Sequence, residues 1–373
     1  MTVARVADLV SILESWAPRE WADSWDNVGL LVGALDRPAE RVLVALELTD
    51  PVLAEAEAWG AQLLVLHHPP IFKPLPALRF DRGAGPRLER LVRAGIGVYA
   101  AHTNLDVAPG GVNDQLAAAV GLQEPRVLRP TGEDRPLKLV TFVPRDHVDR
   151  VRKALSNAGA GVIGLYAECS FETPGTGTFR PLPGANPYLG TVGELERAEE
   201  VRLEMILPES RAQAAVAAML EAHPYEEVAY DLYPLQNPGA RRGHGRVGRL
   251  PQPMRLRELA ERLKEVLRVP ALRMVGDPDR VVSVAATAPG SGASLIQAAA
   301  AAGAEVLIGG DIDHHDAWDA VDAGLAVLDP GHFATEALVL PEVARRVREG
   351  LQARGLAGEV RVAESGTGPF TFC

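Results

Sequence analysis

Apolar runs alternate with helical patterns along the first part of this 373-residue chain, and this alternation constrains its fold more than any other feature. Each run is short and is followed by a segment with helical periodicity. Strands and helices in alternation predict a largely parallel sheet that is covered by helices. The predicted strands cover residues 41–48, 62–68 and 96–102, and the predicted helices cover residues 50–60, 84–94 and 110–122.

The rest of the chain shows two further patterns. Residues from about 131 to 243 contain strands and helices around a Gly- and Pro-rich stretch from Thr173 to Gly193. Their order is close to the β-α-β, β-α-β order of a ferredoxin-like domain. From about residue 244 the first pattern returns. Its predicted elements are a helix over 255–267, strands over 281–288, 305–311 and 325–332, and helices over 292–302 and 333–350.

These patterns predict an α/β protein with a split core. Residues 1–130 and 244–373 would form two similar α/β halves, and residues 131–243 would form an inserted α+β domain. The hydrophobic share of 47% is high enough for folded cores and argues against disorder.

Composition limits the cellular locations and the classes of partner to be expected for this chain. No apolar stretch approaches the roughly 20 residues of a membrane span, and charges interrupt the N-terminal segment where a secretory signal would be apolar. The two cysteines, Cys169 and Cys373, predict neither a disulfide framework nor a cysteine zinc site. A formal charge of −11 argues against nucleic acid as a partner. We therefore expect a cytoplasmic protein that neither spans a membrane nor binds nucleic acid.

Two adjacent histidines follow one of the apolar runs. His67 and His68 come at its end, where Pro69 and Pro70 stop the strand. Neighbouring residues of a regular strand point to opposite faces, so the two imidazoles can converge only because the strand ends there. The alternative is one buried and one solvated histidine. Because ligands of open α/β sheets bind beyond the carboxyl ends of strands, this position is a candidate site.

Two other strand ends carry a histidine and a carboxylate. His102 and Asp106 lie in a segment that is alternatively a solvated turn, because Asn104 and the glycines that follow predict a loop. His332 and Glu336 have the i, i+4 spacing that places two side chains on one face of a helix, where they can chelate a metal. The alternative there is a histidine at a helix start beside a solvated glutamate.

The densest polar cluster follows an apolar strand late in the chain. We interpret it as helix capping by Asp311 or Asp313. The cluster also contains His314, His315 and Asp316. Residues of the cluster that do not cap the helix would hydrogen-bond to metal-binding imidazoles and hold them in one tautomer.

Three further segments are weaker candidates. Asp26 and Asn27, which follow Trp25, are equally compatible with a pocket and with a structural turn. The segment APGSG at 288–292 would suit a phosphate at a helix N-terminus, but a simple turn is the better interpretation. His223 lies at a helix end in the inserted segment, and we interpret it as structural.

The strand-end residues together predict a metal site without thiolates. Imidazole nitrogens and carboxylate oxygens suit zinc, iron, manganese or nickel. Two ions about 3.5–4 Å apart activate a water and hold the group that it attacks, and a carboxylate such as Glu336 would bridge them. Two divalent ions per chain would suit these residues. The candidate ligands at the strand ends are His67, His68, His102, Asp106, His332 and Glu336.

Several motifs also resemble one known family. WDNVGLLVG, LLVLHHPPIF, AAHTNLD, GDIDHHDA and DPGHFATE are similar, in this order, to motifs of the Nif-three-like family, the GTP cyclohydrolase 1 type 2 homologues. CSFETPGTGTFRPLPGANPYLG and HPYEEVAYDLYPL resemble the extra domain of its longer bacterial members, which is similar to PII/CutA-like modules. Two positions depart from the pattern, namely Glu47, where family members often carry Asp, and APGSG, where the family tends to be richer in Gly. Neither departure touches the family's five ligand positions, and both concern substrate contacts.

The resemblance implies a dinuclear metal centre in a homohexameric ring, with the metal sites facing an interior cavity and the inserted domains at the ends. His102 would be a pocket residue or an acid/base group. We assign catalytic roles to His102 and Glu336. The implied ligands are His68 and Asp106 for one ion, His67 and His332 for the other, and Glu336 for both.

Two classes of function remain open. A hydrolase, as the resemblance implies, would act on GTP or a similar nucleotide-like small molecule through a metal-activated water, with His102 assisting proton transfer. A non-catalytic metal-binding or regulatory ring protein is the alternative. Catalysis requires open coordination positions, and five protein ligands over two ions leave such positions.

Overall fold

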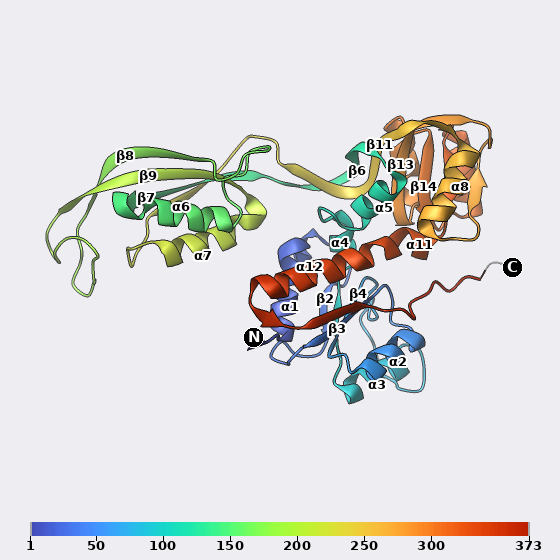
Figure 1. Ribbon diagram of the computed structural model, residues 1–373, viewed down its shortest axis with the longest axis horizontal. Coiled ribbons are helices and arrows are strands. Elements are labelled where there is room, and N and C mark those ends of the chain that lie inside the picture. The colour runs from blue at the N-terminus through green and yellow to red at the C-terminus, as the bar shows by residue number, and fades with distance from the viewer. Residues whose placement is uncertain (1, 372–373) are drawn as a thin grey trace. The chain divides into compact units, whose positions relative to one another are not determined.

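The computed structural model describes residues 2–371, so Cys373 lies outside the described part of the chain. Contacts divide the chain into two compact units (Figure 1). The larger unit contains the chain up to Thr131 and again from Arg242, and the smaller unit is Gly132–Arg241. The predicted α/β class is confirmed, because strands and helices alternate along both parts of the larger unit. No helix among residues 2–371 has the length and apolar character that crossing a bilayer requires.

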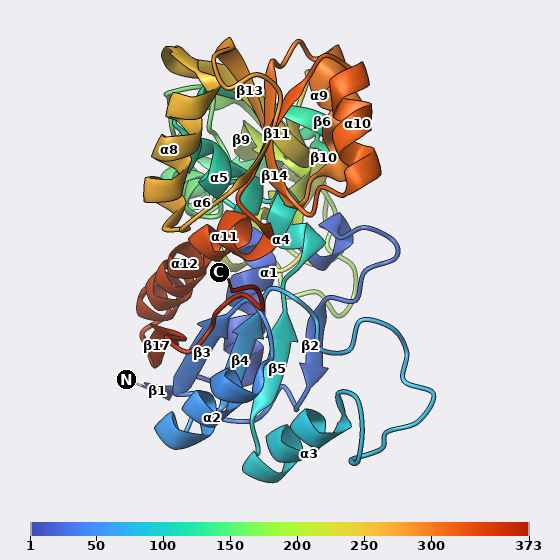
Figure 2. The same cartoon turned by 90° about the vertical axis from the view of Figure 1, so that its right-hand side faces the viewer.

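The first sheet of the larger unit consists of short apolar strands, β2 (Gly29–Val32), β3 (Arg41–Ala45), β4 (Leu63–Leu66), β5 (Gly97–Ala100) and β17 (Glu359–Val362). Their order is β17-β3-β4-β5-β2 (Figure 2). All neighbours are parallel except β2, which pairs antiparallel with β5 at the edge. Every residue of β4 and β5 is buried, as expected for parallel strands covered on both faces.

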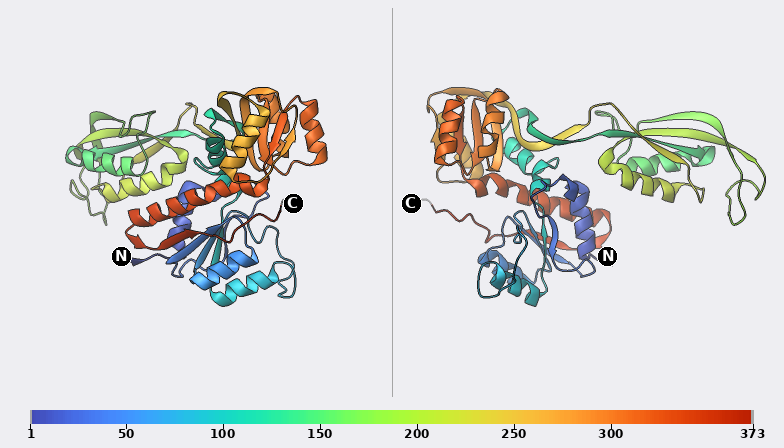
Figure 3. Two further views of the ribbon diagram at one scale, coloured as in Figure 1. Left: turned by 45° about the vertical axis from the view of Figure 1, so that its right-hand side comes forward. Right: turned by 180° about the vertical axis from the view of Figure 1, so that it is seen from behind.

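Helices cover both faces of this first sheet. α1 (Val6–Trp16) and α12 (Leu340–Ala353) pack on one face, and α2 (Asp50–Trp59) and α3 (Gly85–Ala94) pack on the other. Alternate side chains of the central strands enter the two apolar cores, as the two-residue period of a strand requires. In Figure 3, α12, in red, lies beside α1, in dark blue, so the last long helix packs against the first.

Local sequence signals set the ends of these helices. The Thr49 hydroxyl accepts the Val52 N–H at 3.3 Å and caps the start of α2. Gly60 ends α2 with φ 72°, and Gly95 ends α3 with φ 69°. Glycine suits both positions because a left-handed backbone strains any residue with a Cβ.

The second sheet of the larger unit consists of β6 (Gln123–Asp134), β11 (Ala240–Arg255), β12 (Arg273–Val275), β13 (Val281–Ser291), β14 (Val306–Gly310) and β15 (Ala326–Asp329). Their order is β12-β15-β14-β13-β11-β6, and the three central strands β15, β14 and β13 are parallel. Apolar residues again fill both faces. The covering helices are α5 (Val112–Val120) and α8 (Leu256–Leu267) on one face, and α9 (Ile296–Ala301) and α10 (His314–Asp322) on the other.

Two short helices lie between the two sheets, α4 (Thr103–Val107) and α11 (His332–Glu336) (Figure 2). The single helix predicted over 333–350 is therefore wrong. It consists of α11 and α12, which a 3-10 turn at Ala337–Val339 separates. A small parallel pair, β1 (Thr2–Val3) with β16 (Leu356–Ala357), completes the larger unit.

The smaller unit has an antiparallel sheet covered by helices on one face (Figure 1). In chain order its elements are β7 (Pro136–Pro144), α6 (Val148–Asn157), β8 (Ser170–Phe179), β9 (Glu196–Pro208), α7 (Ala212–Ala222) and β10 (Tyr230–Pro234). The strand order β10-β7-β9-β8 gives the β-α-β-β-α-β arrangement predicted for this segment. β8 lies where the sequence predicted only a Gly- and Pro-rich stretch. It carries no apolar alternation because most of its residues are exposed.

Candidate metal centre

His67 and His68 continue the path of β4 beyond its last residue. The His67 N–H donates to the Ala45 carbonyl at 3.2 Å, and the His68 N–H donates to the Leu46 carbonyl at 2.8 Å. The two ring centroids are 4.9 Å apart. The imidazoles therefore converge at the strand end, and the alternative of one buried and one solvated histidine does not hold. His67 is 2% exposed, and the side chain of His68 is 22% exposed.

Oxygen acceptors fix the orientation of four imidazoles. A backbone carbonyl accepts only, so the Nδ1 atom of His67 carries its hydrogen and the Nε2 lone pair points into the site. For the other three rings, a carboxylate oxygen accepts the Nδ1 hydrogen in the same way. Metal-binding histidines in proteins are generally held in this way, through the nitrogen that does not bind the metal. The Nδ1 contacts are His67 with Ala101 O (2.8 Å), His68 with Glu47 Oε1 (3.2 Å), His102 with Asp26 Oδ1 (2.9 Å) and His332 with Asp311 Oδ2 (2.7 Å).

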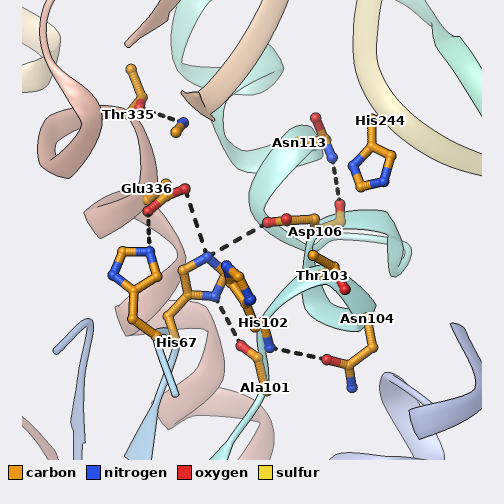
Figure 4. Close-up of polar contacts among 12 residues, drawn as sticks. His67, Ala101, His102, Thr103, Asn104, Asp106, Asn113, His244, Thr335 and Glu336 are labelled. Atoms are coloured by element: carbon orange, nitrogen blue, oxygen red, sulfur yellow. Dashed lines mark hydrogen bonds and ion pairs between the residues drawn. The ribbon is translucent and has the colours of Figure 1, made fainter. Parts of the chain in front are cut away.

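The Nε2 atoms face Asp106 and Glu336 in two groups. His67 Nε2 lies 3.6 Å from Asp106 Oδ1 and 3.8 Å from Glu336 Oε1 (Figure 4). His68 Nε2 and His332 Nε2 each lie 3.0 Å from Glu336 Oε2, and 3.3 Å from each other. The family resemblance instead implies His68 with Asp106 and His67 with His332, so the distances and the resemblance suggest different groupings, and the assignment of these residues to ions stays a prediction. α11 places His332 on the side of His68, and α4 places Asp106 on the side of His67.

Three buried polar atoms of this cluster have no hydrogen-bond partner among residues 2–371. They are His67 Nε2, Asp106 Oδ1 and Glu336 Oε2. Because buried polar groups are normally satisfied, each such atom requires an explanation. A lone pair on His67 Nε2 that faces two carboxylate oxygens is repelled unless a cation or a proton lies between them. The set of donor atoms and their burial therefore fit divalent metal ions.

The charges of the cluster favour positive charge at its centre. Burial alone would lower the pKa of His68, but the Glu336 and Glu47 carboxylates raise it to about 10. Burial would likewise lower the pKa of His332, but Glu336 and Asp311 raise it to about 9. Burial would raise the pKa of Glu336, yet the imidazoles beside it hold that pKa well below its usual range. Metal ions would take the place of the protons that these imidazoles otherwise bind.

His102 completes the group on the side of the first sheet. Its ring lies 5.2 Å from that of His67 and 5.5 Å from that of His68, between centroids. Asp26 accepts hydrogen bonds from His102 Nδ1 and from the backbone N–H of Thr103 at 3.0 Å. Burial would raise the pKa of Asp26, but its hydrogen bonds with His102 and Thr103 lower it to about 2. Asp26 is thus a site residue that holds His102, which the sequence left open between a pocket and a turn.

A glycine brings the second sheet close to the ligands. Gly290 belongs to the APGSG segment at the end of β13 and has φ +68°. A Cβ there would lie 2.1 Å from Glu336 Oε1 and 3.4 Å from His332 Nε2. The Gly290 N–H donates to the Thr335 hydroxyl at 3.0 Å, so this backbone also supports α11. The segment is therefore part of the wall of the metal centre.

The structure separates the remaining sequence candidates. Asp313 caps α10, because its side chain accepts hydrogen bonds from the backbone N–H groups of His315 and Asp316. It is one of the two residues predicted to cap this helix. His314 and His315 are exposed and lie outside the ligand cluster. His223 is buried in the smaller unit, where its Nε2 contacts the Phe142 carbonyl at 3.1 Å, as the structural interpretation requires.

One histidine near the centre had no signal in the sequence. His244 Nε2 lies 3.3 Å from Asp23 Oδ2, and the ring is drawn beside Asp106 in Figure 4. It lies in β11, far from the predicted strand ends. Only its neighbouring glycines, in the run RRGHGRVG, mark the position as unusual.

Two aromatic side chains stand beside His102 and are open to solvent. Trp25 is 57% exposed and Phe72 is 41% exposed, and their ring centroids are 5.8 Å apart. Trp25 lies 6.0 Å and Phe72 lies 6.3 Å from the His102 ring. Exposed aromatic rings next to buried ligands form a surface on which a flat molecule can stack.

Sequence comparison places the chain among known proteins. It matches the family described as Duf34/NIF3 (NGG1p interacting factor 3) over residues 4–369. A protein of Bacillus subtilis (strain 168) named GTP cyclohydrolase 1 type 2 homolog is 44% identical over 364 residues, which are 98% of this chain and 97% of the relative. A protein of Mycobacterium tuberculosis (strain ATCC 25618 / H37Rv) with the same name is 41% identical over 337 residues, 89% of this chain and 88% of the relative.

Comparison of structures gives the same result. The crystal structure of a Bacillus cereus protein related to NIF3 matches with a TM-score of 0.89 and 43% sequence identity, and the match covers 100% of both chains. The similarity therefore extends over both parts of the larger unit and over the smaller one.

Proposed function

The chain belongs to the Duf34/NIF3 family, and on that basis we propose that it is a hydrolase that depends on two divalent metal ions and acts on a nucleotide-like small molecule. The observation that carries the proposal is the set of orphaned buried atoms, His67 Nε2, Asp106 Oδ1 and Glu336 Oε2. The relatives named GTP cyclohydrolase 1 type 2 homolog make GTP the first substrate to test.

Each ion would have its own group of protein ligands. His67, Asp106 and Glu336 Oε1 would hold the first ion. His68, His332 and Glu336 Oε2 would hold the second, so that Glu336 bridges the two. Bound zinc, iron or manganese ions of this kind activate a water and stabilise charge on the group that the water attacks.

His102 would transfer a proton, and Asp26 would position it. The Asp26 carboxylate accepts hydrogen bonds from His102 Nδ1 and from Thr103, so it is ionised and the His102 hydrogen lies on Nδ1. The remaining ring nitrogen, Nε2, is then free to accept a proton from one reacting group and return it to another. The hydrogen bond to Asp26 also stabilises the imidazolium that forms in between.

Trp25 and Phe72 would bind the flat part of the substrate. Their ring centroids lie 6.0 Å and 6.3 Å from the centroid of His102. A base stacked on these exposed rings would therefore lie within reach of the His102 side chain. This arrangement supports a ring-bearing substrate over an extended one.

Metal content and GTP turnover, measured on the same preparations with added zinc, manganese or iron, test the proposal. We expect about two ions per chain and a metal-dependent loss of GTP. His102→Gln should keep the ions and lose turnover, whereas His315→Gln, which changes an exposed histidine, should keep both. Two ions without turnover would overturn the GTP assignment and favour the alternative, a metal-binding or regulatory protein without catalysis.

We further propose a homohexameric, cytoplasmic protein whose smaller unit is PII/CutA-like. The sequence resemblance supports the hexamer, the cytoplasmic location follows from the composition, and the β10-β7-β9-β8 strand order supports the likeness of the smaller unit to PII/CutA-like modules. Light scattering of the purified protein should give six times the mass of one chain, and a monomeric mass would contradict the ring.

A further inference from the structure

The smaller unit contains a cavity of about 680 Å³ that the metal chemistry does not use. Val201 and Leu203 of β9 enter the core under the helices. Glu200 and Arg202 alternate with them, point to the opposite face of the sheet and line the cavity. Its volume falls within the roughly 300–1,000 Å³ of small-molecule sites. All its lining residues belong to the smaller unit.

A buried carboxylate lies in the wall of this cavity. Glu200 is 9% exposed, and its Oε1 accepts the Tyr225 hydroxyl at 2.8 Å. Its Oε2 has no hydrogen-bond donor within residues 2–371, and no lysine, arginine or histidine of that range forms an ion pair with it. Water reaches this oxygen from the cavity, because it is not among the buried atoms that lack a partner. A carboxylate whose surroundings are mostly protein attracts a cation more strongly than one in open water. The oxygen is therefore available to a positively charged partner from outside the chain.

The glycines of β8 make room for this carboxylate. A Cβ at Gly177 would lie 1.9 Å from Glu200 Oε2, so any side chain there would displace the carboxylate from its place. The neighbouring Gly175 pairs with Glu200 across the strands and also lines the cavity. The glycines of the TPGTGTF sequence of β8, which have no explanation in the apolar core, thus leave room for the Glu200 carboxylate in the wall of the cavity.

Aromatic rings form the next part of the wall. Tyr225 lies 5.9 Å from Phe179 and 6.1 Å from Tyr188, between ring centroids. The Tyr188 hydroxyl contacts His147 Nε2 at 2.9 Å, which holds a ring that is 52% exposed. The faces of such rings carry partial negative charge and attract cations, most strongly where water is excluded.

The charged groups of the wall are mostly acidic. Glu200, Glu226 and Glu227 all line the cavity. Two arginines also line the cavity. The Arg202 guanidinium is already paired at 2.7 Å with Glu204, which is not one of the lining residues. Arg180 remains as the unpaired cation of the wall, and its Nη1 donates to the Gly193 carbonyl at 2.6 Å. The surplus of negative charge favours a cationic ligand.

We propose that this cavity is a second ligand site, which binds a small organic cation with its ammonium or amidinium group on Glu200 and its flat apolar part against Tyr188 and Tyr225. The site is independent of the metal centre and of the hydrolase proposed for it. It gives the inserted unit a binding role of its own for a small amine.

Calorimetric titration of the full-length protein with three molecules of one shape tests the charge of the ligand. Benzamidinium is positive, benzamide is neutral and benzoate is negative. We expect benzamidinium to bind at low millimolar concentration, and at least roughly tenfold more tightly than benzamide, as a charge-assisted hydrogen bond provides. Tighter binding of benzoate would instead indicate an anion site at Arg180 and overturn the proposal. Equal binding of all three, or none, would overturn it as well.

Two matched variants test the position of the ligand. Glu200→Gln should weaken benzamidinium binding roughly tenfold or more, whereas Glu199→Gln makes the same change at the exposed neighbouring residue of β9 and should not. Tyr188→Ala removes a half-exposed ring, should leave the fold intact, and should weaken the same probe even if Glu200→Gln does not fold. Unchanged affinity in both cavity variants would show that the probe binds elsewhere and refute the assignment.

Discussion

Replacing His68 and His332 together tests how the metal ligands are grouped. Both Nε2 atoms lie 3.0 Å from Glu336 Oε2, whereas His67 Nε2 faces Asp106 and the other oxygen of Glu336. His68→Ala/His332→Ala should therefore abolish one ion and keep the other. If the ligands were grouped as the family resemblance implies, the same double variant would remove one ligand from each ion, and both would be weakened.

The magnitude follows from the number of ligands lost. Changing a residue that merely supports a metal ligand costs about 10–100-fold in affinity. Loss of both imidazoles from one ion should exceed the upper end of that range, more than ~100-fold, or about 3 kcal/mol. The ion at His67 and Asp106 keeps all its direct ligands, so its affinity should change by less than about tenfold.

Metal content per chain after dialysis against metal-free buffer is the assay, with competition against a coloured chelator for the two dissociation constants. The expected result is one ion per chain in place of two. His314→Ala/His315→Ala is the control, because it also removes two histidines, which are exposed and lie outside the cluster. A double variant of His68 and His332 that loses both ions, or keeps both, would refute the grouping.

Three further predictions follow from the same geometry. Asp26→Asn should lower turnover by about 10–100-fold at unchanged metal content, because the amide no longer fixes the tautomer of His102; a steady-state assay beside a metal analysis checks this. Metal affinity should rise with pH up to about 10, because the pKa of His68 without metal is about 10 and the protonated ring cannot bind; each displaced proton should contribute about tenfold per pH unit, measured by chelator competition. Gly290→Ala should cost about 1–2 kcal/mol of folding free energy through its left-handed backbone, and should lower metal content because its Cβ displaces Glu336; denaturant unfolding and metal analysis report the two effects.

Much of the candidate site could be predicted because its residues follow apolar strands. The pattern at His67 and His68 identified a strand end, and the i, i+4 spacing identified the shared face of His332 and Glu336. The grouping of these ligands could not be predicted. It depends on how two sheets meet, and no local spacing encodes that.

The missed features share a physical cause, which is a lack of local periodicity. Asp26 lies 76 residues before His102, so their contact leaves no pattern in either segment. β8 pairs with β9 through its backbone while its side chains are exposed, so no apolar alternation marks it. The break between α11 and α12 occurs in an apolar stretch, ALV, that is equally suited to a continuous helix.

The first sheet of the larger unit is completed by the last part of the chain. α12 covers one face beside α1, and β17 pairs with β3. A ribosome therefore releases the N-terminal strands long before the segment that shields them has been made. The intervening Gly132–Arg241 unit has its own apolar core and is able to fold in the meantime. We expect nascent chains stopped before Leu340 to expose the apolar face of the first sheet and to depend on chaperones until synthesis passes Val362.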